Sequence, residues 1–125
     1  MPHLTIDCSS PLAGLFERSG LLGELHRLVL QESRSQGVCK TWLRPALTYV
    51  GENPERHTSL VHVEVGLLAG RSNALKDRLA DRIVELLHRH LSAAGRRAVI
   101  ISAEVRDLAS SYRLVPHHTA QRRVH

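Results

Sequence analysis

Apolar and polar positions along the chain switch between a strand-like period of two and a helix-like period near 3.6, and the same order occurs twice. In the first half, Leu4–Cys8 alternates as a strand does, and Leu12–Glu32 has apolar residues at helical spacing. Gly20 interrupts the early turns of that pattern, which favours a helix start near Leu21. The segment Val38–Val50 is extended in character. The first half therefore predicts a strand, a helix and a second strand.

The second half repeats this order with a stronger signal. Ser59–Leu67 is rich in valines that alternate with polar residues, which predicts a strand. A Gly-Arg-Ser turn follows, and its last residue, Ser72, is a suitable N-cap for a helix over Ala74–Leu91. Ala98–Val105 is apolar and β-branched, and predicts the last strand.

The two halves predict one α+β domain over residues 1–125, built as a two-layer α/β sandwich from pseudo-repeats 2–51 and 58–108, with a tail over 109–125. Each right-handed β-α-β crossover makes its two strands parallel. Two such units side by side give a four-stranded mixed sheet with two helices on one face. Pro45 argues against a central strand position or marks a bulge. The other sheet face needs a partner, so we expect an oligomer, and the tail wraps a neighbouring subunit or is disordered.

Composition narrows the class of partner. The formal net charge of +5 favours anionic partners, but an aromatic content of 3% is too low for base stacking, so we expect no nucleic acid partner. No apolar run is long enough to span a bilayer, and no signal peptide pattern is present, so we expect no membrane partner. Cys8 and Cys39 suit a reducing cytoplasm, where we expect the protein to reside.

Pro2 is the residue with the most distinctive candidate chemistry. Methionine aminopeptidase removes Met1 readily before a small residue, so we expect the mature chain to begin with proline. Its nitrogen would then be a secondary amine. Burial or nearby cations lower the pKa of an amine below the usual α-amino range of about 7.7–8.0. A neutral amine at the start of a strand would serve as a general base.

Other chemistries have little support in the sequence. His88 and His90 lie two residues apart on a predicted helix, so they point in different directions and do not share a metal. The pair at 117–118 has no adjacent carboxylate or cysteine, so we expect no metal. No phosphate loop or nucleophile elbow is present. His62 alternates with valines as an interior or interface histidine does, and Glu64 on the same face is placed to pair with a cation.

The opening Met1-Pro2-His3, the block from Leu60 through Gly70-Arg71-Ser72, and the duplicated β-α-β order resemble the tautomerase superfamily. Within it the chain most resembles the 5-carboxymethyl-2-hydroxymuconate isomerases, over about residues 2–108. The resemblance implies a tautomerase (MIF-like) fold and a homotrimer whose sheets face inward, with an active site near each N-terminal proline. It also implies that no metal or organic cofactor is needed.

The resemblance implies roles for four residues. Pro2 matches the catalytic base, and Arg71 matches an arginine that binds a substrate carboxylate. A second arginine of the family falls on Lys40, which keeps the charge but loses the planar fork. Arg44 is close enough in sequence to take that role after a small register shift. A further basic position of the family is Trp42 here, so we expect a less cationic pocket on that side.

The resulting functional hypothesis is a cofactor-independent isomerase of a small anionic substrate. Pro2 would convert a 2-hydroxy-dienoate, similar to 5-carboxymethyl-2-hydroxymuconate, to its 2-oxo isomer in aromatic-compound catabolism. Lys40 in place of arginine leaves other superfamily activities open: a phenylpyruvate-type tautomerase, a hydratase or a decarboxylase. An alternative of another class is a non-catalytic trimer that binds anions or protein partners.

Overall fold

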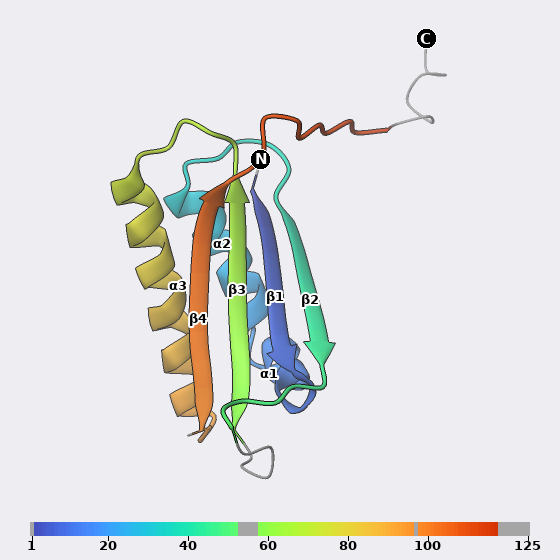
Figure 1. Cartoon of the computed structure of the whole chain (residues 1–125), viewed down its shortest axis with the longest axis vertical. Coiled ribbons are helices and arrows are strands. Elements are labelled where there is room, and N and C mark those ends of the chain that lie inside the picture. The colour runs from blue at the N-terminus through green and yellow to red at the C-terminus, as the bar shows by residue number, and fades with distance from the viewer. Residues whose placement is uncertain (1, 53–57, 97, 118–125) are drawn as a thin grey trace.

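Two β-α-β units lie side by side in a single mixed sheet (Figure 1). The computed structural model describes residues 2–52, 58–96 and 98–117. Within these residues the sheet has four strands in the order β2-β1-β3-β4. Strands β1 and β2 are parallel, β3 and β4 are parallel, and β1 and β3 are antiparallel. The strands are β1 His3–Ser9, β2 Lys40–Ala46, β3 Ser59–Leu67 and β4 Val99–Asp107. The predicted mixed sheet is confirmed.

Helices cover one face of this sheet (Figure 1). The second half has one long helix, α3 Asn73–Ala93, while the first half has α1 Ala13–Arg18 and α2 Leu21–Glu32 after a short 3-10 turn. The sequence predicted two helices, but the described residues form three. Gly20 divides α1 from α2 because its φ of 75° is left-handed, a conformation that glycine adopts without steric cost. The predicted helix start at Leu21 is confirmed.

The core lies between the helices and the sheet. Alternate residues of the two central strands point toward the helices, and the valines of β3 are fully buried, as their alternation predicted. The apolar stripes of α2 and α3 pack against them. Members of the core with no exposed surface include Leu4, Ile6, Val61, Val63, Val65, Leu25, Val29, Leu79, Ile83 and Leu87. These contacts fix the positions of β1 and β3, whose ends form the site described below.

Phe16, the single phenylalanine of the chain, makes a test of this packing because its side chain is fully buried in α1. We expect Phe16→Ala to lower the free energy of unfolding by about 3–5 kcal/mol, since the change leaves a cavity in a close-packed core. Urea denaturation measures the loss. Leu47→Ala is the control: Leu47 is 85% exposed, so its truncation should cost less than about 0.5 kcal/mol. Equal effects would contradict the described core.

Strand β2 lies at an edge of the sheet, which explains its proline. Pro45 is opposite Cys8 of β1, and the other side of β2 pairs with no strand of the described chain. Because proline has no N–H to donate, an edge position is where a sheet tolerates it. The prediction that Pro45 does not lie in a central strand is confirmed.

Polar side chains dominate the second sheet face, which none of the helices in the described part of the chain covers. His62 and Glu64 stand on it, as the alternation of β3 predicted. Arg106 of β4 donates two hydrogen bonds to Oε1 of Glu64, at 3.0 and 2.6 Å, so the predicted cation partner is confirmed. Nδ1 of His62 lies 2.7 Å from Oγ of Ser102. Several polar and charged side chains of the uncovered face therefore pair with one another within the chain. No helix of the described residues is long and apolar enough to cross a membrane.

Candidate active site

Pro2 lies at the end of the sheet where β1 and β2 begin and β3 and β4 end. It is buried, and its carbonyl accepts a hydrogen bond of 3.1 Å from the backbone N–H of Lys40. The parallel register then sets His3 opposite Lys40. Pro2, the predicted base, and Lys40, a predicted cation, are 38 positions apart in sequence. They are neighbours in the structure because β1 and β2 pair.

Two rings lie near the Lys40 ammonium group, and His3 packs against both of them. Lys40 Nζ donates a 3.0 Å hydrogen bond to the hydroxyl of Tyr112 and lies 5.4 Å from that ring and 5.9 Å from the ring of Trp42. His3 packs edge-on against Tyr112 at 4.8 Å and tilted against Trp42 at 5.7 Å, between ring centroids. Cation–π contacts of this kind are individually modest. Together they define a cationic, ring-lined surface next to Pro2.

The pKa of His3 indicates the electrostatic character of this surface. Burial lowers the pKa of His3 from 6.5, and the positive charges of Lys40, the chain's amino terminus and Arg106 lower it further. Its Nε2 is buried and has no hydrogen-bond partner among the residues that the structure describes. Burial and these charges therefore favour the neutral form of a basic group at this end of the sheet.

The pKa of His3 makes stability depend on pH in a definite direction. Between the lowered folded pKa and about 6.5, the unfolded chain binds a proton that the folded chain does not. The contribution of His3 to the free energy of unfolding is therefore fully present above about pH 6.5, and it is lost as the pH falls below that value. We expect His3→Asn to reduce this loss in urea unfolding measured from about pH 5 to 7.5. His88→Asn, at an exposed position of α3, is the matched control. A wild-type slope in His3→Asn, or an equal reduction in both variants, would contradict the assignment.

Arg71 lies in the loop between β3 and α3, which is at the same end of the sheet as Pro2 (Figure 1). Its Nε donates to the carbonyl of Ser33 and its Nη2 to Oγ of Ser35, both at 3.1 Å. These bonds fix the guanidinium against the segment that leads from α2 into β2. Because a guanidinium has five N–H donors, others stay available for a carboxylate. The loop is set by Ser72, whose Oγ caps α3 by accepting from Leu75 N–H at 3.1 Å, as predicted.

Arg44 lies further along β2. It is four residues from Lys40, or about 13 Å at 3.3 Å per strand residue. It forms a bidentate ion pair with Asp7 at 2.8 and 3.0 Å, and the hydrogen bond and charge of Asp7 raise the pKa of Arg44. Of the two predicted cations on β2, Lys40 therefore lies beside Pro2 within one chain, and Arg44 does not. The role of Arg44 in substrate binding stays a prediction.

Tyr112 is the site residue that sequence reasoning missed. The tail from Ser110 onward has no periodicity, and the sequence predicted only that it wraps a neighbour or is disordered. In the structure Tyr112 instead contacts His3 and Lys40 of its own chain. The short turn that follows β4, in which Tyr112 N–H donates to Ala109 at 2.9 Å, has no distinctive sequence signal. The part of the tail from 118 onward lies outside the described residues.

The surroundings of the two cysteines do not favour a nucleophilic thiolate. Cys8 is buried in β1 and Cys39 is half-buried before β2. Burial raises the pKa of both thiols, and for Cys39 this outweighs the opposite effects of a hydrogen bond to Thr41 and of the amino terminus. A thiol with a raised pKa stays protonated near neutral pH and is a poor nucleophile.

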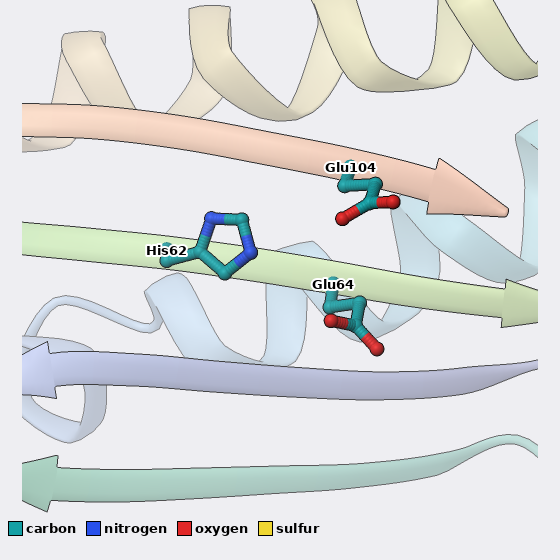
Figure 2. A group of neighbouring side chains, drawn as sticks. All are labelled: His62, Glu64 and Glu104. Atoms are coloured by element: carbon teal, nitrogen blue, oxygen red, sulfur yellow. The ribbon is translucent and has the colours of Figure 1, made fainter.

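A group of side chains of metal-ligand types lies on the uncovered sheet face. Figure 2 shows His62 and Glu64 on β3 beside Glu104 on β4, and one ligand atom of each lies within 4.8 Å of the others. Arg106 already neutralises Glu64 through its 2.6 Å contact. The group therefore balances part of its charge within the chain, and we assign it no metal.

Comparison with known proteins identifies what this arrangement resembles. The family model of 5-carboxymethyl-2-hydroxymuconate isomerase matches residues 2–121, nearly the whole chain. Among curated protein sequences, none matches this chain.

Solved structures share the fold at low sequence identity. A 5-carboxymethyl-2-hydroxymuconate isomerase from Deinococcus radiodurans R1 is 21% identical, with a TM-score of 0.76 over 98% of this chain and 93% of that one. A macrophage migration inhibitory factor-like protein from Entamoeba histolytica is 14% identical, with a TM-score of 0.64 over 93% and 96%. A fused 4-OT described as a symmetric trimer is 15% identical, with a TM-score of 0.66 over 86% and 87%. The predicted MIF-like fold is confirmed.

Proposed function

Because the chain belongs to the 5-carboxymethyl-2-hydroxymuconate isomerase family and is an isomerase, we propose that it moves a proton within an anionic 2-hydroxy-dienoate, with the nitrogen of Pro2 as the base. The proposal requires removal of Met1, which leaves a secondary amine at Pro2. We further propose that the substrate arises in the breakdown of aromatic compounds, where ring opening yields conjugated dienols with carboxylate groups.

The proposed reaction is an internal proton transfer. The amine of Pro2 removes the proton of the 2-hydroxyl group, and the electron pair of that O–H bond forms the 2-oxo group. The conjugated double bonds shift, and the prolinium returns the proton to a distant carbon of the diene. One O–H bond breaks and one C–H bond forms, so no oxidant or reductant is consumed. General base catalysis of this kind contributes typically about 10²–10⁴-fold.

The observation that supports this role most directly is the electrostatic setting of Pro2. Pro2 is buried and hydrogen-bonded through its carbonyl to Lys40, and the pKa of the adjacent His3 is lowered by burial and by the charge of Lys40. The same two causes favour a neutral proline amine at working pH. A neutral amine accepts a proton without first losing one.

Lys40 and Arg71 would bind the charged groups of the substrate. Lys40 is the first residue of β2 and its backbone N–H contacts the carbonyl of Pro2, so its ammonium group would meet one carboxylate of a substrate bound at this end of the sheet. Arg71 is fixed by Ser33 and Ser35, so its free N–H groups are already oriented for a second carboxylate. Positive charge near the carboxylates also stabilises the dienolate that forms when Pro2 takes the proton.

A substrate screen tests the proposal. Mass spectrometry first verifies that the purified, untagged chain begins at Pro2. Ultraviolet absorbance then follows the loss of the conjugated dienol, with the spontaneous rate subtracted. We expect a dienol with two carboxylates to be converted faster than any substrate with one. Retention of Met1 in cells, or rates equal to the spontaneous ones for all dienols, would contradict the proposal.

A second candidate activity within the same site is tautomerisation of an aryl enolpyruvate. The rings of His3, Trp42 and Tyr112 beside Lys40 favour a substrate with one carboxylate and one aromatic group. The screen decides between the candidates if it includes phenylenolpyruvate. Faster conversion of phenylenolpyruvate than of the dicarboxylate would favour this activity.

We also propose that the protein is a homotrimer. No helix of the described residues covers one face of the sheet, and Trp42 and Ile100 on this face are exposed in the single chain. A relative of similar fold is described as a symmetric trimer. Sedimentation analysis should give three times the chain mass of 13.9 kDa.

The proposed cellular location is the cytoplasm. Cys8 and Cys39 are free thiols in the structure. Free thiols of this kind are typical of a reducing compartment. A fluorescent fusion at the C-terminus, which leaves Pro2 free, tests the location.

A further inference from the structure

The segment Leu108–Tyr112, which we call the crossing segment, passes over the end of the sheet after β4. Leu108 N–H donates to the carbonyl of Leu67 at 2.6 Å, so the segment starts against the end of β3. The Leu108 side chain lies over Gly66: a Cβ added to Gly66 would be 2.6 Å from Leu108 Cδ2. The absence of a side chain at Gly66 is what allows this close approach.

The crossing segment ends at the strands that form the site. Tyr112 closes a turn by donating its N–H to Ala109 at 2.9 Å. Its ring then packs edge-on against His3 of β1, and its hydroxyl accepts a 3.0 Å hydrogen bond from Lys40 of β2. Figure 1 shows the chain leaving β4 and passing the N-terminal end of β1. One segment thus connects the last strand to the residues around Pro2.

We propose that Tyr112 is a positioning residue, which holds the Lys40 ammonium where it meets a substrate carboxylate beside Pro2. A lysine side chain is flexible and has no planar fork, so alone it is poorly oriented for a carboxylate. The hydrogen bond from Nζ to the Tyr112 hydroxyl is charge-assisted and leaves two ammonium protons for the substrate. The His3 contact fixes the Tyr112 ring in turn. This inference rests on the proposed function of the site.

The first test is a double-mutant cycle on the isomerase reaction. Tyr112→Phe keeps the ring and removes the hydroxyl, and Lys40→Met removes the charge. We expect Tyr112→Phe to raise KM about fivefold to tenfold, the loss of one charge-assisted hydrogen bond in an accessible site, with kcat within about twofold. In the Lys40→Met background the same change should have no effect, because Tyr112 acts through Lys40. Additive effects, or wild-type KM in Tyr112→Phe, would overturn the inference.

Tyr49→Phe is the matched control, since Tyr49 is the other tyrosine of the chain and is 70% exposed in the segment after β2. It removes a hydroxyl from the same residue type without touching the site. We expect KM and kcat equal to those of the wild type. An equal rise in KM in both variants would mean that the effect is not specific to Tyr112, and would overturn the inference.

A binding measurement separates this inference from the proposed function. Trp42 is the single tryptophan and lies beside Lys40, so its fluorescence reports on the site. Titration with adipate, an unreactive dicarboxylate, should give a Kd about fivefold higher in Tyr112→Phe than in the wild type or Tyr49→Phe. Absence of isomerase activity in the wild type as well as in the variants would contradict the function proposed for Pro2 but leave this binding comparison intact. No fluorescence response to adipate in the wild type would overturn the inference itself.

Gly66→Ala tests the same idea from a distance. The new Cβ displaces Leu108, which moves the crossing segment and with it Tyr112, while Lys40 and Tyr112 stay chemically unchanged. We expect a rise in the adipate Kd of the same direction as in Tyr112→Phe. An unchanged Kd would show that Lys40 does not depend on the crossing segment.

Discussion

Pro2→Ala should lower kcat for dienol ketonisation by about 10²–10³-fold, because the residue that takes and returns the proton changes in basicity and in position. Proline is a secondary amine whose ring fixes the nitrogen at the start of β1, whereas an N-terminal alanine is a primary amine with a freely rotating backbone. The Lys40 contact to the carbonyl of residue 2 is kept. We therefore expect KM to change less than kcat. Initial rates at saturating substrate measure the effect.

A second form of the experiment leaves the proline in place. A chain with a cleavable N-terminal extension has Pro2 as an amide, which is no base, and protease trimming restores the free amine. Activity should appear only after trimming. Pro11→Ala is the matched control, since Pro11 is exposed in the turn after β1. Full activity in either Pro2→Ala or the uncut chain would exclude the proline as the base.

The fold was largely predictable because its signals are local and agree with one another. The valines of β3 alternate, Ser72 caps α3, and Pro45 excluded β2 from the centre of the sheet. The sequence also showed Gly20 as an interruption. It did not show that the residues before Gly20 form a helix of their own, because a six-residue helix is stabilised by the burial of Leu15 and Phe16 and not by its own periodicity.

The candidate site was predictable only in part. Pro2 and Lys40 come together through strand pairing, which the repeated β-α-β order implies. Tyr112 comes from an aperiodic segment, and its position depends on the absence of a side chain at Gly66, a contact between residues far apart in sequence. Local sequence patterns give little indication of contacts between such distant residues. The pKa of His3 likewise depends on its burial and on the charges of Lys40 and Arg106, which are far from it in sequence.

Arg71→Ala should lower kcat/KM by about 10²-fold or more, because a carboxylate that loses its paired guanidinium stays partly desolvated in the site. Arg71→Lys should recover part of the loss, since it restores the charge without the fork. Arg82→Ala, an exposed arginine on α3, is the control and should keep wild-type kcat/KM. The measurement is the initial rate against substrate concentration, for the dicarboxylate and for phenylenolpyruvate.

Arg71 also ties two loops together, so its catalytic and structural effects must be separated. Loss of its bonds to Ser33 and Ser35 should lower the free energy of unfolding by about 1–2 kcal/mol in Arg71→Ala. Ser35→Ala removes the bond to Nη2, together with the 2.8 Å hydrogen bond that Ser35 Oγ accepts from Ser33 Oγ, and keeps the charge of Arg71 and its bond to the Ser33 carbonyl. If Arg71 binds substrate, Ser35→Ala lowers kcat/KM by no more than about threefold, whereas a purely structural arginine would make both variants similarly defective. A loss in Arg71→Ala that is larger for the dicarboxylate than for phenylenolpyruvate would assign Arg71 to the second carboxylate; equal losses would assign it to the carboxylate that both substrates share.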